Sequence, residues 1–209
     1  MSPPDKMRFD HQVIASWIAP GSRVLALGCG EGDLLRLLKQ EKQVAETGIE
    51  IVESRVLACI EKGLSVLQGD INEELRDYPD GAMDYVILSQ TLQEVLDPAG
   101  LIAEMLRVGQ KAIVSFPNFG HWRLRGQLLF RGQAPVSRDL PYEWYETPNI
   151  RVLSIRDFKR FVRKMGMRVE REAAIASASS VVPSRRRGQV VRLLPNLLAT
   201  YGIFELSRP

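Results

Sequence analysis

Cysteine and histidine are scarce in this 209-residue sequence, which contains only two of each. Two cysteines cannot build the disulfide framework of a small secreted domain, and neither the cysteines nor the histidines have the spacing of a zinc site. Long apolar runs are also missing, since no stretch of about eighteen apolar residues is available to cross a membrane. The polar, charged N-terminus does not have the pattern of a signal peptide. These absences predict a cytoplasmic protein with no membrane span and no metal.

Charge of either sign is present in nearly equal amounts, with a formal net charge of +3. Because no basic stripe is interleaved with aromatic residues, this small excess does not predict nucleic-acid binding. A hydrophobic content of 45% is typical of a globular protein. The length suits one domain with a substantial core. We therefore expect a single domain over residues 1–209, beginning with a tail and a helix in residues 1–20.

Three glycines at alternate positions follow an apolar run near the N-terminus. Residues 24–27 predict a buried parallel strand, and Gly28, Gly30 and Gly32 predict a tight turn with no Cβ atoms to block a ligand. The backbone amides that begin the next helix would face the space above this turn. The dinucleotide fingerprint G-x-G-x-x-G is excluded, because Asp33 holds its last position. The order G-x-G-x-G instead resembles motif I of the class I S-adenosylmethionine (SAM) methyltransferases; the alternative is a plain β–α turn.

Apolar runs that alternate with amphipathic segments predict a doubly wound, mostly parallel sheet. The expected strands are residues 22–27, 44–50, 64–67, 83–89, 111–116, 167–175 and 201–206. The expected helices are residues 8–18, 31–39, 52–62, 98–108, 122–131, 155–165 and 190–199. The side chains expected to be buried in the third and fifth of these helices are Val56, Leu57, Ile60, Leu124, Leu128 and Leu129. The predicted fold class is thus α/β, a Rossmann-like sheet of seven strands similar to the class I SAM methyltransferases, with one antiparallel edge strand.

Ligands of such sheets bind at the carboxyl ends of the strands, so the residues that follow each strand are candidate cofactor contacts. Glu50 follows the second strand, where a carboxylate can accept hydrogen bonds from both ribose hydroxyls; the alternative is a solvated charge. Asp70 follows the third strand, and in the resembling family this position accepts from the adenine amino group; the alternative is a turn cap. The expected contacts are Gly28, Cys29, Gly30, Gly32, Glu50, Ile51, Asp70, Ile71, Ser89 and Gln90.

Ala26 stands where motif I of the resembling family usually has an acidic residue. Losing one hydrogen-bond acceptor costs about 1–3 kcal/mol, which predicts weakened but measurable binding of SAM or S-adenosylhomocysteine (SAH). No N-P-P-Y/F signature of amino methylation follows the fourth strand. His121 is a candidate base or substrate ligand, with a helix cap as the alternative. We expect His11 to be a surface residue and Cys29 to fill a tight turn.

Two later segments have the composition of surface loops. Residues 133–149 are rich in proline and aromatic residues, which predicts either a lid over the cleft or a surface that contacts a partner. Residues 177–188 contain serines, alanines and three consecutive arginines, which predicts an exposed, flexible loop whose charges form a solvated face.

The segments Pro-Asn-Phe-Gly-His-Trp at 117–122 and Leu-Leu-Pro-Asn-Leu-Leu-Ala at 193–199 resemble the MetW family of methionine biosynthesis proteins. Residues 9–10, 24–35 and 141–149 share this resemblance, which spans roughly residues 8–207. It implies a role beside MetX, the homoserine O-acyltransferase, as a partner that its activity requires or that stimulates it. The family has no firmly attached methyl acceptor. The competing hypothesis is a genuine SAM-dependent methyltransferase acting on a small molecule, and a nucleic-acid methyltransferase comes last.

Overall fold

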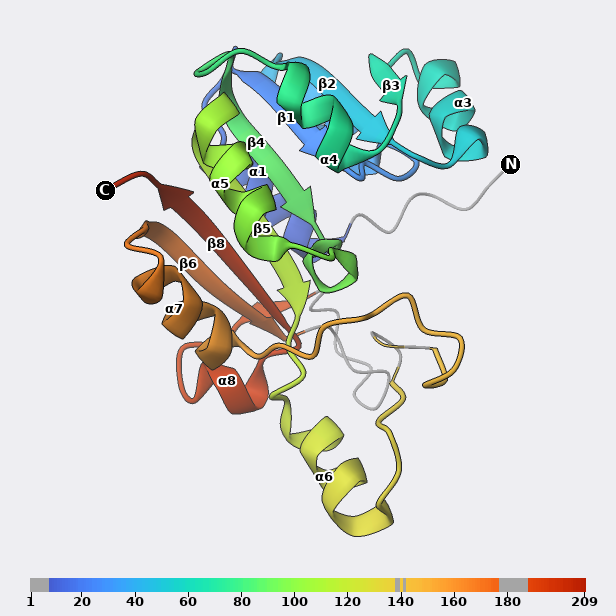
Figure 1. Ribbon diagram of the computed structural model, residues 1–209, viewed down its shortest axis with the longest axis vertical. Coiled ribbons are helices and arrows are strands. Elements are labelled where there is room, and N and C mark those ends of the chain that lie inside the picture. Colours follow the sequence, from blue (N-terminus) through green and yellow to red (C-terminus); the bar gives the residue numbers. More distant parts are fainter. Residues whose placement is uncertain (1–7, 138–139, 141, 177–187) are drawn as a thin grey trace.

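A twisted sheet runs through the computed structural model, which describes residues 8–137, 140, 142–176 and 188–209 (Figure 1). Its strands follow the order β3-β2-β1-β4-β5-β8-β6-β7. In that order they span Val66–Gln68, Ala45–Glu50, Arg23–Leu27, Met83–Ser89, Gly109–Pro117, Tyr201–Ser207, Arg168–Ala176 and Gln189–Val190. The pairs from β3 to β5 are parallel, whereas β8 runs antiparallel to both β5 and β6. The carboxyl ends of β1 to β5 therefore meet at one edge of the sheet.

Helices cover both faces of the sheet because alternate residues of a buried strand point to opposite sides. Val24 of β1 packs in one core cluster with residues of α1 (Phe9–Trp17) and α2 (Asp33–Lys42). Leu25 and Leu27 pack in the other cluster with residues of α5 (Pro98–Val108) and α7 (Ile155–Lys164). A smaller cluster joins Ala26 to α2 and α3. The remaining helices are α3 (Glu53–Glu61), α4 (Ile71–Glu74), α6 (Trp122–Arg131), α8 (Pro195–Leu198) and the 3-10 turns η1 (Leu75–Asp77) and η2 (Leu92–Glu94).

The predicted fold class is confirmed, and two details of the sheet differ from the expectation. The sheet has eight strands in the described residues, because the two-residue strand β7 pairs antiparallel with the end of β6. The long antiparallel strand β8 is also not at the edge, since it lies between β5 and β6. Insertion of β8 completes the hydrogen bonding of β5, whose residues 112–117 are buried in the centre of the sheet.

Two expected apolar stripes were wrong because periodicity does not identify the packed side of a helix. Leu57 and Ile60 of α3 are more than half exposed, and the buried side of this helix is formed by Val56 and Cys59. Leu128 and Leu129 of α6 are likewise exposed. The apolar residues of these two helices exceed what the neighbouring described elements cover.

The helix expected over residues 190–199 is also wrong. Residues 189–190 form β7, and a four-residue helix, α8, begins only at Pro195. Leu194 before it adopts a left-handed conformation with φ of 46°. Proline fits the first position of a helix but cannot sit in its interior, so Pro195 starts the helix rather than interrupting it. The loop expected at residues 177–188 falls, up to residue 187, outside the described residues.

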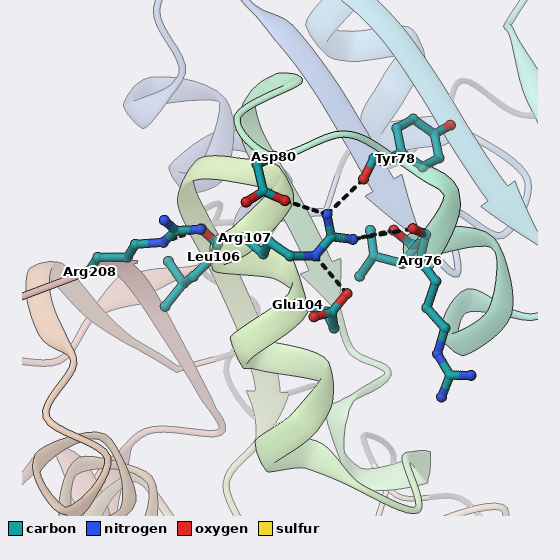
Figure 2. Close-up of polar contacts among 8 residues, drawn as sticks. Arg76, Tyr78, Asp80, Glu104, Leu106, Arg107 and Arg208 are labelled. Carbon is teal, nitrogen blue, oxygen red and sulfur yellow. Dashed lines mark hydrogen bonds and ion pairs between the residues drawn. The ribbon is translucent and has the colours of Figure 1, made fainter.

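A single arginine anchors the segment that leads into β4 (Figure 2). Arg107 of α5 donates to the carbonyl oxygens of Tyr78 and Leu75 over 2.8 and 3.1 Å. It also donates to the carboxylates of Asp80 and Glu104 over 2.7 and 2.9 Å. These contacts tie the connection between η1 and β4 to α5, which fixes how β4 enters the sheet. Within the described part of the chain, no helix has the length and apolar character needed to cross a membrane.

Candidate functional site

The glycine loop leaves the carboxyl end of β1 with three residues in the left-handed region. Gly28, Gly30 and Gly32 have φ angles of 61°, 58° and 77°, so each needs a backbone conformation that other residues rarely adopt. Cys29 N donates to Ile49 O over 3.1 Å, which joins the loop to the end of β2. The predicted tight turn is therefore present.

The three glycines have different surroundings. A Cβ on Gly32 would lie 2.4 Å from Leu64 Cδ1 and 2.8 Å from Cys59 Sγ, so this glycine is required by packing inside the protein. A Cβ on Gly28 would meet Thr91 Oγ1 at 3.1 Å. A Cβ on Gly30 would meet no atom of the described chain within 4 Å. Gly30 is thus the position at which a ligand can approach the backbone of the loop.

Glu50 lies directly beside this loop and is only 3% exposed. Its Oε2 accepts a hydrogen bond from Gly30 N over 2.8 Å, and its Oε1 accepts from Val52 N over 3.0 Å. The Arg55 guanidinium lies 3.8 Å from Oε1. The alternative of a solvated charge at the strand end does not hold, because the carboxylate is buried and orders the loop. Its predicted role in holding a ribose stays a prediction.

The residues that follow β2 and β3 come close together at the same edge. Gly69 N donates to Glu50 O over 3.1 Å, which brings Asp70 near the end of β2. Asp70 caps α4, since its Oδ1 accepts from Asn72 N over 2.7 Å. This is the turn cap that the sequence left open as an alternative. Ile51 is largely exposed, whereas Ile71 is half-buried and packs against the main core.

Ser89 and Gln90 end β4 in a strained turn. Ser89 Oγ lies 3.1 Å from Ser115 Oγ, and Gln90 N donates to Ser115 O over 2.9 Å. Gln90 has a φ of 60°, which is uncommon for a residue with a side chain. Its Nε2 atom is buried and has no hydrogen-bond partner among the described residues. Backbone strain and unpaired buried donors occur frequently at functional sites, so Gln90 stays a candidate ligand contact.

A cavity of about 140 Å³ opens between the glycine loop and the N-terminal helix α1. Gly28, Gly30 and Ser89 line it from the strand ends, and Arg8 and His11 line it from the N-terminal side. It is smaller than the roughly 300–1,000 Å³ of pockets that enclose a whole ligand. The cavity by itself is too small to enclose a ligand as large as SAM.

His11 is the site residue that the sequence interpretation missed. It was expected at the surface, but it is 7% exposed and lines the cavity. Burial lowers the pKa of His11, an effect that the Asp10 carboxylate beside it opposes. His11 precedes Ile14 and Ala15 by three and four positions, so it lies on the buried stripe of α1. That spacing is the signal that could have identified it.

Cys29 is not equipped to be a nucleophile. Burial, reinforced by the neighbouring Cys59 and Glu50, raises the pKa of the Cys29 thiol to about 12. The Cys59 thiol donates to Gly30 O over 3.2 Å. A thiol that stays protonated is chemically inert at neutral pH, and both cysteines help to pack the loop.

His121 caps α6, since its Nδ1 accepts from Arg123 N over 3.3 Å. The helix-cap alternative thus describes its contact in the structure, and His121 is not among the residues that line the cavity.

Within the described residues, no group of three or more histidine, cysteine or acidic side chains is placed to hold a metal ion. The cavity thus combines the backbone of the glycine loop with the charged side chains of Arg8, Glu31 and Asp33, a lining that suits a polar group.

Solved structures share this fold at low sequence identity. A SAM-dependent methyltransferase from Thermotoga maritima is 17% identical with a TM-score of 0.67, over 96% of this chain and 88% of that one. Magnesium protoporphyrin IX methyltransferase from Synechocystis PCC 6803, solved with bound SAH, is 17% identical with a TM-score of 0.65, over 98% of this chain and 84% of that one. At this identity the likeness establishes the fold.

Sequence relatives identify the family. A bifunctional methionine biosynthesis protein MetXA/MetW from Rhodopirellula baltica (strain DSM 10527 / NCIMB 13988 / SH1) is 34% identical over 175 residues, which is 79% of this chain. The match spans only 28% of that relative's length. The model of the methionine biosynthesis protein MetW family matches residues 8–206. The chain belongs to the MetW family, with the fold of a class I SAM methyltransferase.

Proposed function

We propose that this chain binds SAM or SAH at the glycine loop and acts in methionine biosynthesis as a partner of a MetX-type homoserine O-acyltransferase. The observation that carries the partnership is the relative that joins MetXA and MetW in one chain. Fusion holds two proteins at a high effective concentration, which favours pairs that work in contact. The free thiols of Cys29 and Cys59 suit the cytoplasmic location predicted from the sequence.

The geometry fits the adenosyl part of SAM better than its amino-acid part. Gly30 leaves the space that a close-lying ligand needs, and the Glu50 carboxylate stands beside it to accept from ribose hydroxyls. Ile51 and Ile71 offer apolar contacts for adenine. At the amino-acid end, Ala26 provides no acceptor for the ammonium group, so we expect affinity about tenfold to a hundredfold below that of a site with an acid there.

A partner role agrees with the chemistry available around the cavity. Bound SAM supplies an electrophilic methyl group, and the protein must align an acceptor and often remove its proton. The titratable side chains that line the cavity are Arg8, His11, Cys29, Glu31 and Asp33, and the Cys29 thiol stays protonated because its pKa is raised to about 12. Burial lowers the pKa of His11, which favours the neutral imidazole near pH 7. A neutral imidazole can bind a polar group, but within the described residues no hydrogen bond to the His11 side chain holds it in the orientation of a dedicated base.

The partnership is tested by assaying the purified acyltransferase with increasing amounts of this protein. We expect its turnover to rise and then saturate, and the two proteins to co-purify. Unchanged turnover at every ratio, without co-purification, would overturn the partnership. Repeating the titration with SAM and with SAH shows whether the ligand changes the effect.

The ligand is tested by calorimetry with SAM and SAH. We expect weak binding that Glu50→Gln lowers by about tenfold or more, because a neutral amide replaces a charged acceptor. Glu46→Gln is a matched control, since Glu46 is also buried on β2 but is paired with Lys39 over 2.6 Å. No heat at millimolar ligand, or equal losses in both variants, would contradict the assigned site.

The second candidate function is a SAM-dependent methyltransferase acting on a small molecule. It is favoured by the intact glycine loop, by Glu50, and by the unpaired Gln90 Nε2 at the end of β4. Incubation with methyl-labelled SAM and a small-molecule cell extract separates the two functions. Transfer of label to a defined product supports the enzyme, and retention of all label in SAM counts against it.

A further inference from the structure

Helix α6 presents an apolar face that nothing in the described chain covers. It extends from the end of β5 away from the sheet, at the lower end of the view in Figure 1. Among its residues only Leu124 is buried. Leu129 and Phe130 are 77% and 84% exposed, and Trp122 is half exposed. Large apolar side chains grouped in this way mark surfaces that bind other proteins.

A glycine stands at the centre of this face. Gly126 follows Trp122 by four positions and precedes Leu129 and Phe130 by three and four, so these side chains surround it on the helix surface. A Cβ at this position would lie no closer than 4.0 Å to the side chains of the described residues, the nearest atom being Phe130 Cδ2. Packing among the described residues therefore does not require a glycine here.

Glycine in the middle of an exposed helix destabilises the helix relative to alanine. Close packing against another part of the same chain would explain a glycine at position 126, but the described residues show no such packing. Because Gly126 has no side chain, it leaves a notch between Trp122, Leu129 and Phe130 on the helix surface. Such a notch lets the backbone of a partner protein approach the helix closely. The notch and the apolar side chains around it are two separate observations that point to the same face.

The charge of α6 distinguishes between possible occupants. The helix contains three arginines, Arg123, Arg125 and Arg131, and no acidic residue. The Arg123 guanidinium lies 5.4 Å from the Trp122 ring. In a symmetric pair of two copies the same patch faces itself, which would bring like charges together. A different protein with an acidic rim around an apolar site is the better match.

We propose that the face of α6 formed by Trp122, Gly126, Leu129 and Phe130 is the surface that docks the acyltransferase partner. The inference rests on the proposed function, because the fused relative names MetXA as the protein that accompanies a MetW chain. The docking partner inserts an apolar segment into the notch at Gly126, and its acidic residues face the arginines of α6. The surface is separate from the cavity at the glycine loop, whose lining includes no residue of α6.

Binding of the purified acyltransferase by the full-length protein tests this surface. Leu129→Glu is compared with Leu96→Glu, because Leu96 is exposed to a similar extent, at 80%, on the connection between η2 and α5. We expect Leu129→Glu to weaken binding by at least about 30-fold, the effect of a hot-spot residue. Leu96→Glu should bind as the wild type does, and both variants should keep the affinity for SAH.

Gly126→Ala separates docking from a structural role. Alanine should raise the melting temperature, since it favours the helix, and yet weaken acyltransferase binding by about tenfold or more because the notch is filled. If wild type binds the acyltransferase and Leu129→Glu and Gly126→Ala bind equally well, the docking surface is wrong while the proposed function stands. If wild type does not bind at all, the proposed function fails. Self-association of the wild type that Leu129→Glu abolishes would assign the face to a second copy and overturn the proposal.

Discussion

Gly32→Ala should destabilise this protein strongly, although the residue lies in a loop that looks built for a ligand. The added methyl carbon would lie 2.4 Å from Leu64 Cδ1 and 2.8 Å from Cys59 Sγ, both inside the core cluster that joins α2 and α3. The left-handed backbone, with φ of 77°, costs a residue with a Cβ about 1–2 kcal/mol. Overpacking adds about 1–3 kcal/mol. The expected loss in the free energy of unfolding is therefore about 2–5 kcal/mol.

Gly30→Ala is the matched comparison, because it makes the same change in the same loop without the clash. Its φ is 58°, and a Cβ there meets nothing within 4 Å. Its cost in stability should be only the backbone cost of about 1–2 kcal/mol. Its methyl group stands in the space above the loop, so its main effect should be weaker binding of SAH.

Urea unfolding followed by circular dichroism measures the two stabilities, and calorimetry measures the two affinities. We expect Gly32→Ala to lower the unfolding midpoint by clearly more than Gly30→Ala, and Gly30→Ala to lose more affinity than stability. Equal losses of stability in both variants would refute the assignment of Gly32 to packing. An unchanged SAH affinity in Gly30→Ala would refute the approach of the ligand at that residue.

Three further predictions follow from single side chains. Arg107→Ala should lower the free energy of unfolding by about 1–3 kcal/mol after allowance for solvent screening, because it removes the contacts to the segment before β4. An unchanged midpoint of urea unfolding would contradict this anchoring role. Cys29 should react with iodoacetamide at pH 8 at least about 100-fold more slowly in the folded than in the unfolded protein, since burial raises its pKa to about 12; equal rates would show an accessible thiolate. The hydrogen bonds from Arg23 hold the pKa of Asp84 below its usual value, so the ionised carboxylate stabilises the fold at pH values above the pKa of an unfolded aspartate, and this contribution is lost as the pH falls through the lower folded pKa. Asp84→Asn should therefore flatten the acid side of the plot of unfolding free energy against pH, and an unaltered plot would contradict the assignment.

Local patterns were sufficient for many elements of the fold. Met83–Ser89, Pro98–Val108 and Trp122–Arg131 lie where the apolar periodicity predicts them. The helix expected at residues 155–165 is α7, and Ser154 caps it in a capping box with Asp157. Each of these signals is contained in a few consecutive residues, because strand runs, helix stripes and caps depend on neighbours in the sequence.

The positions of the candidate site residues followed from one topological rule. The carboxyl ends of parallel strands share an edge, so residues that follow β1, β2 and β4 had to come together. The structure brings Glu50 to 2.8 Å from Gly30 and places Ser89 in the wall of the cavity. The rule could not say what each side chain contacts. Asp70 and His121 proved to be caps because their acceptor atoms lie next to backbone amides that start a helix.

The sequence by itself determined the order of the strands and helices up to α7, apart from the short elements α4, η1 and η2. It also determined the glycine loop and the edge of the sheet at which a ligand would lie, because these depend on local patterns and chain direction. Only the tertiary structure decided which side of each helix is buried. The buried side of α1 places His11 in the cavity wall, whereas the apolar side of α6 is exposed to solvent. The physical reason is that burial requires a facing element, and whether one exists depends on distant parts of the chain or on another protein.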